Sequence, residues 1–152
     1  MHNFLIKGRI LHFTSEPDLS NQQSFEYFDE GALVIQDGKI SFCGLATEAE
    51  HLYPRLAVID RTGQLIMPGF IDTHAHYPQT EIIGAYGEQL LAWLNTYTFP
   101  AEEKFFDQKH CEETAEFFLK ECLKNGTTTT MVFATVHPES VEAFFEKSHA
   151  LN

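Results

Sequence analysis

Two histidines separated by one residue, His74 and His76, follow an apolar run with a break at Pro68-Gly69. Because side chains alternate along a β-strand, both imidazoles would lie on one face and could each offer a nitrogen to the same cation. Imidazole nitrogens suit Zn²⁺, and also Fe²⁺, Mn²⁺ or Co²⁺. Asp72 precedes the pair on the same expected face, where its carboxylate could orient a histidine or anchor the strand end. The spacing therefore indicates a candidate metal site.

The position of the histidine pair strengthens this interpretation. By itself an H-x-H spacing arises often by chance, and a single buried histidine is more often a core or surface group than a ligand. Here the pair ends an apolar strand, and active sites in parallel β/α folds form at the carboxyl ends of strands. His137 also ends a predicted strand, but it is better explained as the residue that begins a helix.

The composition is that of a globular protein with a net negative charge. The 152 residues are 43% hydrophobic, and 10 Lys and Arg against 22 Asp and Glu give a formal charge of -12. This charge disfavours nucleic acid and anionic membrane surfaces as partners, and leaves a neutral or cationic small molecule open as substrate. No targeting or membrane-spanning pattern is visible, so we expect a cytoplasmic protein. The three cysteines have no C-x-x-C pairing and are expected to be reduced.

The first 65 residues predict β-structure. Residues 31–44 contain two alternating apolar runs joined by Asp37-Gly38, a strong hairpin signal. A short helix is expected after them, because Thr47 and Glu50 have the spacing of a capping box. Residues 56–70 predict a strand, a turn at Thr62-Gly63 and a second apolar run. We assign residues 1–65 to a small open β-layer with one face uncovered.

From Leu65 the pattern changes to alternating strands and helices. Residues 64–76 and 127–136 predict strands buried on both faces, and an amphipathic helix at 107–126 lies between them, with a stop at Asn125-Gly126. A last helix begins at Pro138. A closed (β/α)8 barrel takes about 200 residues or more, so the chain is expected to be the amino-terminal piece of a longer protein.

The stretch "MPGFIDTHAH" resembles the metal-dependent amidohydrolase superfamily, whose first barrel strand ends in an H-x-H motif. The runs "HYPQTEIIGAYGEQLLAWLNTYTFPAEEKFF" and "KNGTTTTMVFATVHPES" are more specific and resemble the bacterial guanine deaminase family within it. The resemblance implies an α/β fold: residues 66–152 would be the first two β/α units of a (β/α)8 TIM-like metal-dependent hydrolase barrel. Residues 1–65 would be part of a small β-sandwich domain.

The resemblance also implies zinc-dependent hydrolytic deamination of guanine to xanthine and ammonia, a step of purine catabolism. His74 and His76 match two ligands of one Zn²⁺ per subunit, and Gln79 matches a glutamine that contacts the purine. A carboxamide suits that role because it carries both a donor and an acceptor. The remaining ligands and the general acid come from later strands, so we expect no catalytic residue within the chain. The chain alone would be inactive, and the full-length protein a homodimer.

Two other functions remain open at this point. Another amidohydrolase-type deaminase or chlorohydrolase would use the same metal chemistry on a different heterocycle, such as cytosine, a triazine or a modified purine. A non-catalytic amidohydrolase-fold scaffold would work through oligomerisation, but the intact His74 and His76 argue against it.

Overall fold

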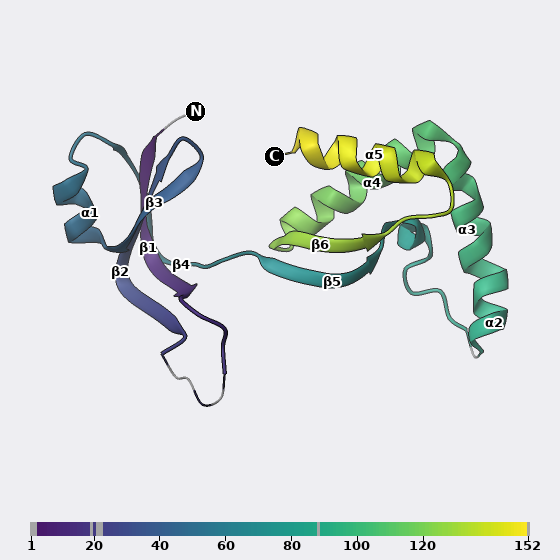
Figure 1. The fold of residues 1–152 in the computed structure, drawn as a ribbon, viewed down its shortest axis with the longest axis horizontal. Helices are drawn as coiled ribbons and strands as arrows, with labels where there is room; N and C mark the ends of the chain where they lie inside the picture. The colour runs from purple at the N-terminus through teal and green to yellow at the C-terminus, as the bar shows by residue number, and fades with distance from the viewer. Residues whose placement is uncertain (1–2, 19, 21–22, 88, 152) are drawn as a thin grey trace. The chain divides into compact units, whose positions relative to one another are not determined.

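The protein divides into two compact units, Met1–Pro68 and Gly69–Asn152. The computed structural model describes residues 3–18, 20, 23–87 and 89–151. In the first unit the described residues form a four-stranded sheet of order β3-β2-β1-β4 and a short helix (Figure 1). The elements are β1 (Phe4–Phe13), β2 (Phe25–Gln36), β3 (Lys39–Leu45), α1 (Ala46–Leu52) and β4 (Ala57–Ile66). Strand β1 runs antiparallel to β2 and parallel to β4.

The predicted hairpin turn at Asp37-Gly38 is confirmed. The two residues join β2 to β3, and both have positive φ angles, 50° at Asp37 and 77° at Gly38. Two successive positive φ angles are the requirement of the tight hairpin turn that matches the twist of the strands. The predicted short helix is also present, but Leu45 is its N-cap residue and makes no side-chain cap. The capping box expected from Thr47 and Glu50 is therefore not used.

Two predictions about the end of the first unit were wrong. The expected turn at Thr62-Gly63 is an irregularity inside one strand, because the register of β4 on β1 shifts between Asp60 and Leu65. Gly63 has a φ angle of 85°, so the chain bulges there without reversing. The expected strand over residues 64–76 is two strands, since β4 ends at Ile66 and pairs with β1. Pro68 follows, and it has no N–H for a ladder.

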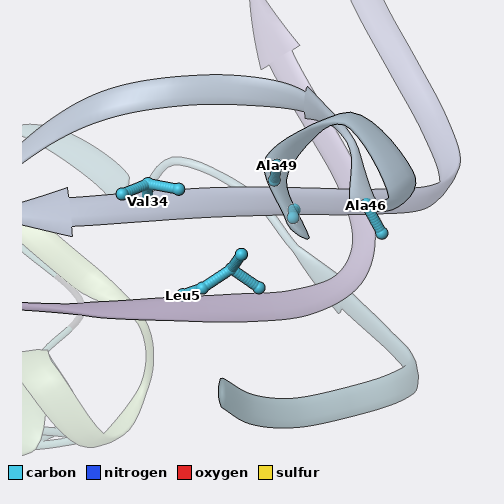
Figure 2. Packing of buried hydrophobic residues seen from close by; sticks show 5 residues of the cluster. Leu5, Val34, Ala46 and Ala49 are labelled. Atoms are coloured by element: carbon cyan, nitrogen blue, oxygen red, sulfur yellow. The ribbon is translucent and has the colours of Figure 1, made fainter. Parts of the chain in front are cut away.

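The core of the first unit lies between the sheet and α1. Figure 2 shows Leu5 of β1 and Val34 of β2 together with Ala46 and Ala49 of α1, and all four side chains are buried. The small alanines let the short helix approach the strands closely. Other apolar side chains of this sheet remain exposed, including Ile40, Val58 and Leu65.

The second unit contains a parallel strand pair covered on one side by helices (Figure 1). Its elements are β5 (Phe70–His76), η1 (Tyr77–Ile82), α2 (Leu90–Trp93), η2 (Leu94–Thr98), α3 (Phe99–Glu103), η3 (Lys104–Phe106), α4 (Gln108–Lys124), β6 (Thr127–Phe133) and α5 (Pro138–Ala150). The predicted order of strand, helix, strand and helix is confirmed. The predicted burial of both strand faces is not found among the described residues, where Phe70 and Ile71 of β5 are exposed. None of the described helices is long and apolar enough to cross a bilayer.

Tyr77 occupies the centre of the core of the second unit. It is fully buried, and its ring contacts those of Phe105, Phe118 and Phe144. Its hydroxyl donates a hydrogen bond to the backbone carbonyl of Ser140 in α5. Burial raises the pKa of Tyr77, so the phenol stays neutral and keeps its proton for this bond. Tyr77 thus connects the end of β5 with α4 and α5.

Helix α4 has a capping group at its start and a left-handed residue after its end. The Asp107 carboxylate accepts a hydrogen bond of 2.9 Å from the backbone N–H of His110. At the other end Gly126 has a φ angle of 82° and leads directly into β6. The predicted stop at Asn125-Gly126 is therefore confirmed, and it fixes where the second parallel strand begins.

Replacing Gly126 with alanine is expected to lower the free energy of unfolding by about 1–2 kcal/mol, because an L-residue is strained at this φ angle. The added Cβ would also lie 3.4 Å from the Phe70 ring, which is ordinary contact, so strain is the main cost. Chemical denaturation of the full-length protein measures the change. Lys124→Ala in the preceding turn is the control, with an expected change within about 0.5 kcal/mol. Equal stabilities for the two variants would contradict the argument.

Candidate functional site

The carboxyl ends of β5 and β6 lie at the same edge of the strand pair, where His76 is aligned with Phe133. His74 and His76 project from the end of β5 with their Nε2 atoms 3.1 Å apart. Two nitrogens bound to zinc at about 2.0–2.1 Å are about 2.9 Å apart at a right angle and about 3.3 Å apart at the tetrahedral angle. The observed separation lies between these values. The separation of the two Nε2 atoms is therefore one that two ligands of a single zinc ion can have.

Phe133, at the end of β6, packs against both imidazoles. Its ring centroid lies 4.7 Å from that of His76, with the ring planes 12° apart, and 5.0 Å from that of His74. Such stacking restricts the rotation of both rings. Phe133 is not among the site residues predicted from the sequence. Only the parallel pairing of β5 with β6 places Phe133 beside the histidines.

Asp72 contacts the backbone of the histidine segment and not an imidazole. Its Oδ1 accepts a hydrogen bond of 3.0 Å from the backbone N–H of His74. Between the aligned pairs Asp72–Thr130 and Ala75–Val132, β5 advances three residues while β6 advances two. This irregularity interrupts the alternation that was expected to place Asp72 on the face of the histidines. Of the two roles considered for Asp72, the geometry fits anchoring of the strand end.

Gln79 lies in η1, which turns back directly after β5. Its Nε2 is 3.3 Å from Nδ1 of His76 and 3.0 Å from Oε1 of Glu102 in α3. The fold therefore brings Gln79 beside the histidine pair, within hydrogen-bonding distance. Glu102 lies within a run that resembles the family but was not predicted as a site residue, because its contact with Gln79 joins residues 23 apart and depends on the packing of α3 beside η1.

An open hollow of about 300 Å³ adjoins Gln79 and His76. Its lining is mostly apolar and comprises His76, Gln79, Thr80, Ile82, Ile83, Gly84, Ala85, Trp93 and Phe118. The indole N–H of Trp93 donates a hydrogen bond of 2.9 Å to the carbonyl of Ala85, which holds the loop after η1. The ammonium of Lys104 lies 2.6 Å from the Glu81 carboxylate and lowers the pKa of that group. This ion pair connects η1 with η3.

Residues 65–152 match the amidohydrolase family. The chain belongs to this family. The amidohydrolase chain is 43% identical over 150 residues to guanine deaminase of Escherichia coli K12, an alignment that covers 97% of the chain and 34% of the relative. The resemblance expected from the motifs is thus confirmed.

Two solved structures extend this similarity of the amidohydrolase chain. Guanine deaminase from Bradyrhizobium japonicum superposes with a TM-score of 0.92 at 33% identity, covering 99% of the chain and 33% of the relative. Guanine deaminase from C. acetobutylicum, with guanine bound in its active site, gives 0.77 at 32% identity, covering 95% and 33%. The chain spans about a third of the length of the relatives it matches. The mixed α/β fold therefore has amidohydrolase neighbours over nearly the whole chain.

The described residues of the amidohydrolase chain contain no complete metal site. Within the described residues, no group of three or more His, Cys, Asp or Glu side chains gathers where it could hold a metal ion. Catalytic zinc usually has three protein ligands and one open position. An ion held by His74 and His76 would therefore need further ligands from outside the described residues.

Proposed function

We propose that this chain is the amino-terminal part of a zinc-dependent guanine deaminase, which converts guanine and water to xanthine and ammonia. The observation that carries the proposal is the pair of Nε2 atoms 3.1 Å apart with the Gln79 carboxamide beside them. Support comes from the 43% identity to a guanine deaminase over 97% of the chain. Family resemblance further supports a homodimer.

The proposed architecture follows from the same similarity. We infer that β5 and β6 are the first two strands of a (β/α)8 barrel, so that residues 66–152 form its first two β/α units. Residues 1–65 would then be part of a small β-sandwich. The parallel pairing of β5 with β6 supports the barrel, and the exposed Phe70 and Ile71 are then available to pack against further barrel residues.

In the proposed reaction the residues of the candidate site have different roles. His74 and His76 would hold zinc through Nε2, and Phe133 would keep both rings in place. When bound there, zinc would supply water activated for attack, because it lowers the pKa of that water toward neutrality. Gln79 would bind the base and direct the carbon that carries the amino group toward that nucleophile. Asp72 would anchor the strand through the His74 backbone. Departure of ammonia also needs a general acid, which we do not assign within this chain.

The direct test is turnover of guanine by the full-length protein loaded with zinc. We expect xanthine and ammonia to form in equal amounts, measured by chromatography and by an ammonia assay. Turnover of cytosine or a triazine in place of guanine would favour another amidohydrolase. A protein that neither retains zinc nor converts any of these substrates would favour a non-catalytic scaffold.

Replacing Gln79 with alanine is expected to reduce kcat/KM for guanine by about 100-fold, because the base would lose a positioned hydrogen-bonding partner. Slow turnover of other heterocycles, where present, should change less than about threefold. Steady-state kinetics with guanine and cytosine checks this selectivity. Gln108→Ala is the matched control, since Gln108 is exposed on α4 and bonds to Glu112. An equal loss for all substrates would argue against a role in reading the base.

A further inference from the structure

We propose that Glu102 is a positioning residue that fixes the orientation of the Gln79 carboxamide. In this orientation Gln79 presents its oxygen, a hydrogen-bond acceptor, to an N–H group of the purine. The inference rests on the proposed contact between Gln79 and guanine. It adds a specificity-determining pair, Glu102 and Gln79, to the site.

The chemistry of the two partners decides which end of the carboxamide faces Glu102. A carboxylate only accepts hydrogen bonds, so the Gln79 atom 3.0 Å from Glu102 Oε1 has to be the nitrogen. Once Nε2 of His76 binds zinc, Nδ1 carries the ring proton and cannot accept from Gln79, and this contact is also longer, at 3.3 Å. The charge-assisted bond to Glu102 is therefore the one that sets the orientation.

Packing of the neighbouring residues holds Glu102 in place. Helix α3 begins with Phe99-Pro100, and its buried residue Ala101 directly precedes Glu102. The following turn η3 buries Phe105 and is tied to η1 by the ion pair between Lys104 and Glu81. Glu102 is half-buried and makes no other hydrogen bond or ion pair within the part of the chain that the structure describes. Its carboxylate is thus available for Gln79 alone.

The orientation has a consequence for recognition. The Glu102 carboxylate takes the nitrogen end of the carboxamide, so the Gln79 oxygen is the end left to meet the ligand. Guanine carries ring N–H groups and an amino group that can donate to such an oxygen. A base that offers only a lone pair at that point would face the oxygen without a hydrogen bond, which disfavours it.

The test is a double-mutant cycle in the zinc-loaded full-length protein with guanine as substrate. Glu102→Gln replaces a carboxylate, which only accepts hydrogen bonds, with a carboxamide that can donate or accept. The Gln79 carboxamide can then pair with it in either of two orientations. We expect KM for guanine to rise about tenfold while kcat changes less than about threefold. Gln79→Glu alone sets two carboxylates against each other and should raise KM by more than about tenfold.

In the reciprocal variant Gln79→Glu/Glu102→Gln, the carboxamide at position 102 donates to the carboxylate at position 79. The second oxygen at position 79 remains free to accept a hydrogen bond from the base. We expect its KM to return to within about threefold of wild type. Glu103→Gln is the control, because Glu103 is the exposed neighbouring glutamate on the same helix. Zinc content and the thermal midpoint are measured for every variant. A purely structural role would lower the midpoint and kcat without this reciprocal recovery of KM.

Two results would overturn the inference while leaving the proposed function in place. One is a wild type that deaminates guanine together with a Glu102→Gln variant of unchanged KM. The other is a double variant no better than the worse single variant. A zinc-loaded wild type that leaves guanine unchanged would overturn the proposed function and this inference with it.

Discussion

Replacing His76 with alanine in the full-length protein is expected to reduce zinc content to a small fraction of one ion per subunit. The same change should lower kcat/KM for guanine by at least about 1000-fold, because the metal that activates water would lose a direct ligand. The effect should exceed that of Gln79→Ala, since His76 lies at the meeting point of His74, Gln79 and Phe133.

Metal analysis of the purified variant, combined with the ammonia assay, checks this prediction. His51→Ala is the control, because His51 is exposed on α1 and lies in the other unit of the chain. It should keep full zinc content and turnover. A His76→Ala protein that still holds one zinc per subunit and deaminates guanine would remove His76 from the proposed metal site.

Replacing Tyr77 with alanine is expected to lower the free energy of unfolding by about 3–5 kcal/mol, since it removes a fully buried aromatic ring and leaves a cavity. Tyr77→Phe keeps the ring and removes only the hydroxyl. Its expected cost is about 1–2 kcal/mol, because the Ser140 carbonyl then loses its side-chain donor. The two variants therefore separate packing from hydrogen bonding at a single position.

Urea denaturation of the full-length protein measures both changes. Lys120→Ala on the exposed side of α4 is the control, where loss of the surface ion pair with Glu116 should cost less than about 1 kcal/mol. A loss below about 1 kcal/mol for Tyr77→Ala would show that this core contributes little to the stability of the protein.

The features that the sequence predicted well are those with local physical causes. Asp37-Gly38 and Asn125-Gly126 mark places where the backbone needs a positive φ angle, and Gly38 and Gly126 have it. The helical periodicity of residues 107–126 matches α4, which buries Cys111 and Ala115. In each case the signal lies within a few neighbouring residues.

The features that the sequence did not reveal depend on which strands and helices meet. The bulges beside Gly63 and between Asp72 and Ala75 arise from pairing with β1 and β6, so alternation within a single strand could not locate them. Phe133 joins the site through a strand aligned with β5, and Glu102 through a helix that packs beside η1. The histidine pair itself could be found because both members lie on one short strand.

The stacking of Phe133 on both imidazoles gives the histidine pair a spectroscopic signature. Protons held over the face of an aromatic ring resonate upfield of their usual positions. The nearly parallel rings of His76 and Phe133 have their centroids 4.7 Å apart. The ring protons of His76 should therefore be distinguishable from those of solvent-exposed histidines such as His51 in an NMR spectrum. Substituting Phe133 with leucine would return these resonances toward their usual positions. Zinc binding could then be followed through the resolved ring resonances of His76.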